Sequence, residues 1–319
     1  MSIEILDPVA EVEESAPSRR RLRKLGWVGW VSIGVIAFAL LLALFGPIFA
    51  PFDPNSSDLS FSNVGPYGSH LLGFDGQGRD VLSRLMVGAR TTIFGAAFVA
   101  IVSITIGSFL AIVTAWFGGK IDAGVSVGID VLFAFPGILL AVLAAAVFGP
   151  SLFSAALALS LAYSPYVARV LRGAALKERA MTYIAALEVQ GFGAWRLCVR
   201  HLLPNISSLI VAQGTILFGF AMVDLAAISF LGLGVQTPQA DWGVMVSDGK
   251  TSLLQGYPLV SISAVLCIVA VVAAVSFLGD RLDASSRDVN QGCRGVRADS
   301  DFPMAPDARA SRRTAGKSA

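Results

Sequence analysis

The chain has 319 residues, of which 55% are hydrophobic and 14% are charged, and its mean hydropathy is +0.71. Several apolar runs are longer than the core helices of soluble proteins, which excludes an ordinary soluble domain. Because lipid offers the backbone no hydrogen-bond partners, segments that cross a bilayer must be helices rather than open strands. The composition therefore predicts an all-α polytopic membrane protein. The formal net charge of +2 gives no argument for nucleic acid as a partner.

Both ends of the chain are predicted to be tails. Residues 1–18 are acidic and lack helical periodicity, and residues 284–319 are rich in Arg, Asp, Ser, Ala and Gly. We therefore expect an N-terminal tail at 1–24 and a disordered C-terminal tail at 284–319. The apolar run at 25–52 is much longer than the ~7–15-residue core of a signal peptide, so it is expected to be an uncleaved first span.

Six transmembrane helices are predicted within a membrane domain at 25–283, since a bilayer core of ~30 Å needs ~20 apolar residues in a helix. The turn sequence Gly149-Pro150-Ser151 divides the stretch at 123–168 into two spans. The six spans are expected within 25–52, 91–119, 123–148, 152–168, 206–235 and 251–279.

Lys and Arg residues concentrate on one side of this arrangement. With the N-terminus inside, 20 of the 24 basic residues fall on the cytoplasmic side, and only Arg79, Arg84, Arg90 and Lys250 fall outside. Loops that stay in the cytoplasm carry an excess of Lys and Arg. Both termini and the loop at 172–204 are thus predicted to be cytoplasmic, in a cell (inner or plasma) membrane.

The predicted external loop at 51–90 has several turn residues and ends in the sequence LLGFDGQGRDVLSRLMVGAR. Asp80 and Arg84 share one helical face, whereas Val81 and Leu85 are expected to lie on the membrane surface. One interpretation is an interfacial helix that leads into the second span. The other is a lid or docking surface at the outer mouth.

The predicted cytoplasmic loop contains a compact basic helical hairpin. Residues 174–189 favour a helix, which Gly191 breaks. Residues 194–201 favour a second helix, which Pro204 is expected to stop. A short rigid element transmits force if it seats in a groove on a partner, although an ordinary loop that obeys the positive-inside rule would have the same composition.

The hairpin resembles the coupling motif of ABC importer permeases, which is written E-A-A, three residues, G, nine residues, I-x-L-P. The spacing is intact here, but Ala185 stands at the Glu position, Leu187 at the second Ala position and His201 at the Ile position. Arg200-His201 and the following Asn205 resemble the dipeptide and oligopeptide branch, whose pattern nickel importers share. The resemblance assigns ATPase coupling to Ala185, Ala186, Leu187, Gly191, Arg200, His201, Leu203 and Pro204.

Other stretches resemble the same branch. The external sequence is similar to its motif G-x-D-x-x-G-R-D, which is carried here by Gly73, Asp75, Gly78, Arg79 and Asp80. The stretch at 229–250 resembles the segment that closes the fifth span, and the sequence FLGD stands at 277–280. The likeness extends from about Gly26 to Asp283.

This resemblance implies the type I ABC importer permease fold and a C-type subunit of an importer for peptides or nickel, a transport subunit rather than an enzyme. Its implied partners are a second permease subunit, two ATP-binding subunits that hold ATP-Mg, and an external solute-binding protein. No cofactor is expected on this chain. The sequence DGKT at 248–251 is similar to the end of a nucleotide-binding motif, but Val244 stands where its first glycine is required.

Asp224 and Asp130 lie within predicted spans, and charged residues there are functional candidates. Asp224 either faces the transport pathway or forms a hydrogen bond to a neighbouring helix. An ion-coupled secondary transporter is the alternative class. A metal site is not expected, because His70 and His201 are predicted on opposite sides of the membrane.

Overall fold

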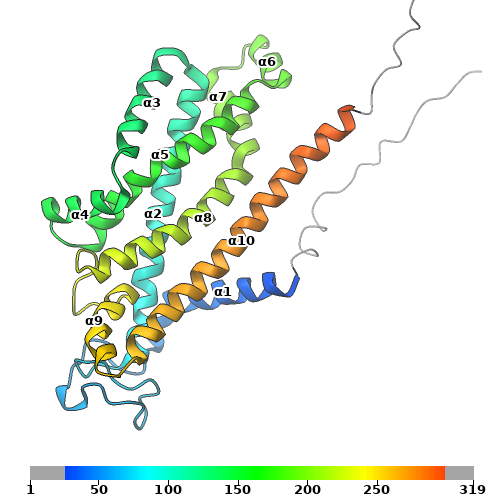
Figure 1. Cartoon of the computed structure of the whole chain (residues 1–319). Helices are drawn as coiled ribbons and strands as arrows, with labels where there is room; N and C mark the ends of the chain where they lie inside the picture. The colour runs from blue at the N-terminus through cyan, green and yellow to red at the C-terminus, as the bar shows by residue number, and fades with distance from the viewer. Residues whose placement is uncertain (1–25, 299–319) are drawn as a thin grey trace, which may run out of the picture. The chain divides into compact units, whose positions relative to one another are not determined.

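The computed structural model describes the backbone of residues 26–298 and the side chains of residues 26–281 (Figure 1). The predicted tail at 1–24 and the last part of the C-terminal tail lie outside these residues. Helix α10 continues to Ala298 and so takes in the first part of the predicted tail at 284–319.

The described backbone is helical, with two isolated β-bridges in the segment before α2. It is divided into two compact units, one made of 26–102, 133–163 and 215–278, the other of 103–132, 164–214 and 279–298. The helices are α1 (Gly26–Phe49), α2 (Val81–Phe117), α3 (Gly119–Phe133), α4 (Gly137–Phe148), α5 (Leu152–Arg179), α6 (Thr182–Val189), α7 (Ala194–Leu197), α8 (Leu203–Phe230), α9 (Trp242–Leu254) and α10 (Leu259–Ala298), with a 3₁₀ turn η2 (Leu59–Phe61) and a π-helical turn η3 (Cys198–Leu202).

By length and apolar composition, four helical stretches among the described residues are able to cross a membrane. They are α1, α2, the stretch from α7 through α8, and the apolar part of α10; a bent pair, α3 with α4, makes a fifth if it counts as one span. Helix α5, the predicted fourth span, is not among them. Its apolar part ends at Arg169, and Arg172, Lys177 and Arg179 follow within the same helix.

The predicted third span is two helices rather than one. Helix α3 ends at Phe133, α4 begins at Gly137, and the pair is bent by 82° at the break. Pro136 explains the break, because a proline disfavours helical geometry in the residue before it and has no N–H to donate. Pro165 in α5 is accommodated inside a continuous helix.

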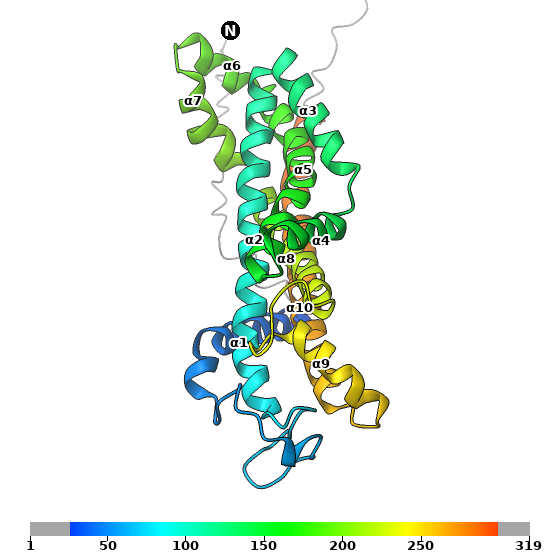
Figure 2. The ribbon, with the colours of Figure 1, turned by 90° about the vertical axis from the view of Figure 1, so that its left-hand side faces the viewer.

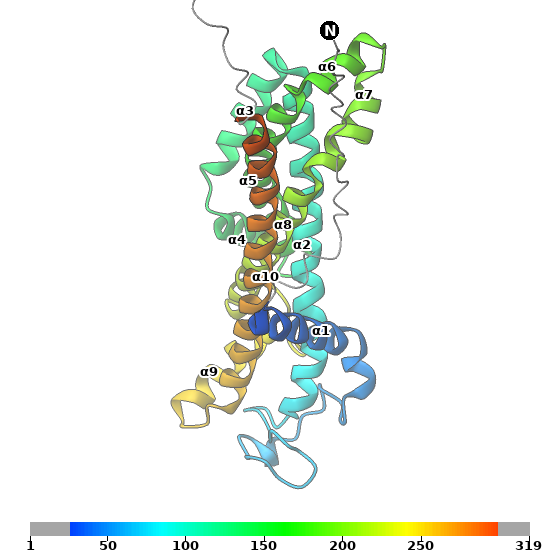
Figure 3. The same cartoon turned by 90° about the vertical axis from the view of Figure 1, so that its right-hand side faces the viewer.

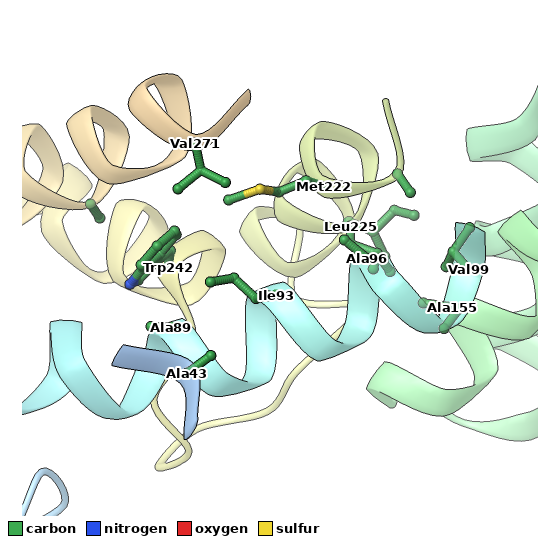
Figure 4. Close-up of a cluster of buried hydrophobic side chains, with 14 of the residues drawn as sticks. Ala43, Ala89, Ile93, Ala96, Val99, Ala155, Met222, Leu225, Trp242 and Val271 are labelled. Atoms are coloured by element: carbon green, nitrogen blue, oxygen red, sulfur yellow. The ribbon is translucent and has the colours of Figure 1, made fainter. Parts of the chain in front are cut away.

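The first unit is built around an apolar cluster of small residues with a few large side chains (Figure 4). The side chain of Trp242 lies beside Ala89 of α2, and Met222 of α8 points toward Val271 of α10. Helix α1 runs crosswise to α2 (Figure 3). A Cβ atom on Gly46 would lie 2.3 Å from the carbonyl oxygen of Met86, so only glycine permits this approach.

Helix α9 is joined to α2 through its N-cap. The Asp241 carboxylate accepts hydrogen bonds from the N–H groups of Gly243 and Val244, at 2.9 and 3.2 Å, and from the hydroxyl of Thr92 at 2.7 Å. These bonds satisfy donors that a helix N-terminus leaves free. Burial raises the pKa of the Asp241 carboxyl, and the hydrogen bonds oppose that rise.

Helix α2 begins at Val81, so the last ten positions of the predicted external loop belong to a helix continuous with the second span. The expectation that Val81 and Leu85 lie on the membrane surface is wrong, since both are buried. The indole N–H of Trp242 donates to the carbonyl oxygen of Leu85 at 2.9 Å, and Arg84 on the other face is buried as well. This turn of α2 is enclosed by the loop before it and by α9, which periodicity in one segment does not reveal.

The second unit contains ion pairs between α3 and α5. Arg172 holds Asp122 through two bonds, at 2.8 and 2.6 Å, and Arg169 pairs with Asp130 at 2.6 Å. Asp130, a predicted intramembrane charge, is therefore paired and exposed. Two small apolar clusters of this unit lie at the C-terminal end of α2.

Candidate functional site

Helices α6 and α7 form the predicted hairpin (Figure 2). Helix α6 ends in a Schellman motif, in which the N–H of Gly191 donates to the carbonyl of Glu188 at 3.0 Å and that of Phe192 to Leu187 at 3.2 Å. Leu187 and Phe192 pack against the same apolar cluster, as this motif favours. Gly191 has φ +85°, a left-handed conformation that glycine adopts at least cost. The break predicted at Gly191 is confirmed.

The inner face of the hairpin is fixed on the end of α2. Ile184 of α6 and Leu197 of α7 are buried against Trp116 and Cys198. The outer face is open: Ala185 and Ala186 are exposed, and the side chain of Val189 at the end of α6 is 90% exposed. Of the other candidate coupling residues, Arg200 and Pro204 are exposed, and Leu187, His201 and Leu203 are half-buried.

The hairpin differs from its prediction at both ends. The first helix is not continuous over 174–189, because α5 ends at Arg179 and α6 begins at Thr182. Pro204 does not stop a helix but lies in the first turn of α8. The helix runs without a break from Ala194 to Phe230, so the proline lies inside a continuous helix, where its missing N–H and its ring disturb the preceding turn. The preceding turn is π-helical, and the N–H of Leu203 donates to the carbonyl of Cys198 five residues earlier.

A polar triad joins the base of the hairpin to both long helices beside it. The Tyr183 hydroxyl of α6 donates to the Glu178 carboxylate of α5. The amide of Asn205 in α8 donates to Glu178 and to the Tyr183 oxygen, each at 2.7 Å. Partial burial and the neighbouring carboxylate raise the pKa of Tyr183 to about 12, so the phenol keeps its proton. The sequence marked Asn205 only through its resemblance and did not indicate Glu178 or Tyr183.

Arg179 fixes the end of α5 to the end of α2. Its guanidinium donates to the carbonyl oxygens of Ala115 and Trp116 and lies 5.0 Å from the centre of the Trp116 ring. The last carbonyls of a helix lack intrahelical partners and carry partial negative charge, so a cation is well placed there. The base of the hairpin is thus held rigidly to the C-terminal end of α2.

The external motif forms a second constellation, which we call the external clasp: Asp75, Arg79, Asp80, Arg84 and Asp248. Its two glycines shape the loop that carries it. Gly73 and Gly78 have φ near +70°, and a Cβ on Gly78 would lie 1.8 Å from the carbonyl oxygen of Asp58. Neither position has room for a side chain.

Charges within the clasp are buried and paired. Arg79 Nε donates to Asp75 Oδ2 at 2.7 Å, and Arg79 also reaches Asp248 of α9 at 2.7 Å. Arg84 donates to the backbone carbonyls of Pro54 and Pro238 at 3.1 and 3.2 Å and lies 3.6 Å from both carboxylates. The clasp thus ties the loop before α2 and the start of α2 to the distant loop before α9 and to α9 itself.

Asp80 completes the clasp on the side of an aromatic stack. Its carboxylate accepts from the Ser83 N–H at 2.7 Å and lies 2.8 Å from His70 Nδ1. The His70 ring stacks on Phe52 with centroids 3.9 Å apart and lies 4.3 Å from Phe74. All five residues of the predicted external motif therefore come together in one folded loop. The roles of Asp248 and His70 were missed, because their positions in sequence give no sign of this proximity.

Asp224 lies half-buried on α8, and its carboxylate accepts a hydrogen bond from the Tyr163 hydroxyl of α5 at 2.5 Å. The hydrogen bond to a neighbouring helix, one of the two interpretations of this residue, is present. The DGKT sequence lies within α9, where Asp248 pairs with Arg79. A helix does not present the backbone N–H groups that a phosphate-binding loop needs.

The hairpin and the external clasp are both parts of a helical membrane protein. The DGKT sequence does not form a nucleotide site in either of them. Residues 103–288 match the family described as "binding-protein-dependent transport system inner membrane component", and residues 19–66 match "N-terminal TM domain of oligopeptide transport permease C". The chain belongs to this family of inner-membrane components and is the permease subunit of an ABC importer, not its ATPase. Within it, the chain is of the oligopeptide permease C type. The alternative of a secondary transporter is set aside.

Three bacterial permeases are similar in sequence to most of this chain. It is 36% identical to the probable D,D-dipeptide transport system permease protein of Escherichia coli over 69% of this chain and 74% of that one. It is 34% identical to a glutathione transport system permease protein of Pectobacterium atrosepticum, over 79% and 85% of the two chains. A dipeptide transport system permease protein of Alkalihalophilus pseudofirmus is 33% identical over 81% and 84%.

A solved structure is similar in fold. The inward-facing MetNI methionine ABC transporter matches 64% of this chain and 96% of its own matched chain, with a TM-score of 0.52 and 21% identity. At this identity the likeness concerns the fold alone. The all-helical membrane fold of an ABC permease is therefore confirmed.

Proposed function

We propose that this permease carries short peptides, of the size of a dipeptide or a tripeptide. Two of the similar permeases are named for dipeptides and one for glutathione. The match to the N-terminal segment of oligopeptide permeases supports the same substrate class. A nickel chelate has no such support among these relatives.

The proposed assembly contains a second permease subunit, two ATP-binding subunits that hold ATP-Mg, and an external solute-binding protein. Six crossings are proposed, with α3 and α4 as one broken crossing and α5 as the next. An even number of crossings puts both termini and the hairpin on one side of the membrane, and the excess of Lys and Arg there makes it the cytoplasmic side. This is the side on which ATPases would have to act.

The α6–α7 hairpin is proposed as the element on which the ATPases act. The observation that carries this proposal is the contrast between its two faces. Its inner face is fixed by apolar contacts and by the Glu178–Tyr183–Asn205 triad. Its outer face presents the small, exposed Ala185 and Ala186, over which a partner's surface is able to approach closely. A force on such an element moves the attached helices instead of bending a loop.

Transport then follows from differential binding. If the ATP-bound pair of ATPases binds the hairpin better in the outward-open state, ATP binding shifts the population toward that state and hydrolysis releases it. The external clasp holds the loop at 51–80 in one shape, which suits it to receive a solute-binding protein. Both roles are proposals that rest on the placement of these residues.

Asp224 is proposed to contribute to the pathway with Tyr163. Because Asp224 is half-buried, one side of the carboxylate is available to the ammonium group of a peptide while Tyr163 holds the other. Asp224→Asn should raise the KM for peptide uptake by roughly 10- to 100-fold, since a hydrogen bond to a charged group is worth about 1.5–3 kcal/mol. Unchanged KM and uptake rate would end this assignment without affecting the rest of the proposal.

The assembly is tested by mild-detergent affinity purification of this subunit, expressed with its genomic neighbours, followed by mass spectrometry. We expect an ATPase, a second permease and a solute-binding protein, and peptide uptake into proteoliposomes that requires ATP. The peptide bound to the binding protein identifies the substrate. Recovery of this subunit alone, active in uptake driven by an ion gradient, would contradict the proposal.

A further inference from the structure

An apolar groove of about 590 Å³ lies in the second unit, beside the hairpin. One wall is the C-terminal part of α2, from Ile104 to Phe117. The other wall is formed by α7, the π-helical turn and the first turns of α8, with Trp195, Val199 and Ile210 as its larger side chains. None of the side chains that line it is charged. Of the candidate coupling residues, Leu203 lines this groove.

The groove has the dimensions of a lipid chain. Its wall on α2 covers 13 residue steps, or about 20 Å at 1.5 Å per residue. One leaflet contributes about half of the ~30 Å hydrocarbon core, so an extended acyl chain fits along this wall. Both long helices that line the groove are candidate membrane spans. The aromatic rim is open, with Phe109 and Phe117 exposed and Trp195 77% exposed.

Two cations stand beside the open rim. Arg196 and Arg200 are exposed and lie one helical turn apart, each next in sequence to a groove-lining residue, Trp195 or Val199. The Arg196 guanidinium lies 5.1 Å from the centre of the Phe192 ring. Among the described side chains, no carboxylate forms an ion pair with either arginine. An apolar groove with unpaired cations at its edge is suited to bind an amphiphile with a negatively charged headgroup.

We propose that this groove binds an anionic phospholipid of the hairpin-side leaflet. One acyl chain fills the groove, and the phosphate is held by Arg196 and Arg200 at the level of the aromatic rim. Since the groove runs along the contact of α2 with α7 and the start of α8, the lipid completes the packing that holds the hairpin. The site is independent of the peptide substrate and of the orientation proposed above.

The rival occupant is a helix of another subunit. Ser108 lines the groove, and its buried hydroxyl has no hydrogen-bond partner among the described residues. A packed helix would supply one, as polar groups do between membrane helices. The unneutralised Arg196 and Arg200 favour the lipid, because an apolar helix would leave both charges unmatched.

The occupant is identified by photo-crosslinking in the complete transporter. Phe109→p-benzoyl-phenylalanine, irradiated in native membranes, should give an adduct whose added mass is that of a phospholipid. An adduct with a second permease or another polypeptide would overturn the proposal. So would the absence of any adduct.

Headgroup recognition is measured separately on the purified complex. Native mass spectrometry after exchange into mixed phosphatidylglycerol and phosphatidylcholine should show a preference for phosphatidylglycerol. Arg196→Gln with Arg200→Gln should reduce that preference about 20- to 30-fold, at about 1 kcal/mol for each arginine. The matched control, Lys120→Gln with Lys177→Gln, removes the same charge from exposed residues that do not line the groove and should keep it. Equal loss in both double variants, or no preference in the unaltered protein, would overturn the phosphate site.

Discussion

The external clasp and the hairpin hold their polar groups in opposite ways. In the clasp, Asp75 and Arg79 are almost completely removed from water and hydrogen-bonded to each other, and the buried Arg84 lies 3.6 Å from the Asp75 carboxylate. In the hairpin base, Glu178 and Tyr183 meet in a triad at the surface. A buried pair fixes one geometry, since removal of either partner leaves an unpaired charge in a poor solvent for it. A surface triad aligns an element at little cost, so that the hairpin moves together with the helices to which it is fixed.

The external clasp and the hairpin also differ in what their glycines are needed for. Gly78 and Gly191 both have a left-handed backbone, with φ +71° and +85°. At Gly78 an added Cβ would meet the backbone of Asp58, whereas at Gly191 it would meet nothing within 4 Å. The clasp therefore demands glycine for space and conformation, and the hairpin demands it for conformation alone.

The largest expected effect is in the clasp. Arg79→Leu leaves Asp75 and Asp248 without their shared cation and should lower the free energy of unfolding by about 3–5 kcal/mol. Thermal denaturation of the detergent-solubilised protein measures the loss. Arg90→Leu, at an exposed arginine of the same helix, is the control. Equal stability of the two variants would mean that the clasp does not hold this loop.

Substitutions of the two glycines sharpen the comparison. Gly191→Val should cost about 1–2 kcal/mol through backbone strain, whereas Gly191→Asn should be tolerated, because Asn adopts the left-handed region more readily. At Gly78, Asn should be as damaging as Val, since its Cβ has no space. Stability and the ratio of ATP hydrolysed to peptide imported are measured for all four. A tolerated Gly78→Asn would show that the close contact with Asp58 is not maintained.

A smaller effect on stability is expected in the triad. Tyr183→Phe removes a donor to Glu178 and an acceptor for Asn205, for about 1 kcal/mol or less at a partly exposed site. Its main consequence should be weaker coupling, measured as more ATP hydrolysed for each peptide imported. Tyr166→Phe on α5 is the control. If both variants couple normally, the triad is only a surface contact.

The smallest effect is expected at an exposed ion pair. Asp130→Asn breaks its bond to Arg169 at a site where both side chains are more than half exposed. Such pairs contribute about 0–1 kcal/mol. Asp122→Asn, which breaks the more buried two-bond pair with Arg172, should cost more. The order of the two melting temperatures checks this, and the reverse order would contradict the pairing described.

The helical membrane class, the positions of the long apolar helices and the break at Gly191 were predictable from the sequence, because apolar runs and a glycine determine local structure by themselves. All five residues of the external motif were selected as well. The sequence could not show that Arg79 meets Asp248, or that Glu178, Tyr183 and Asn205 meet, since these contacts join segments that the fold alone brings together. Pro204 was misjudged because the π-helical turn before it, which the sequence does not reveal, lets the helix continue through the proline.

The most direct test of the coupling role places a photo-crosslinker on the open end of the hairpin. Val189→p-benzoyl-phenylalanine, in the assembled transporter, should give an adduct with the ATPase subunit whose yield changes when ATP is added. Phe148→p-benzoyl-phenylalanine, at an exposed residue at the end of α4, should not give that adduct. An assembly that imports peptide but forms no ATPase adduct from position 189 would contradict the account.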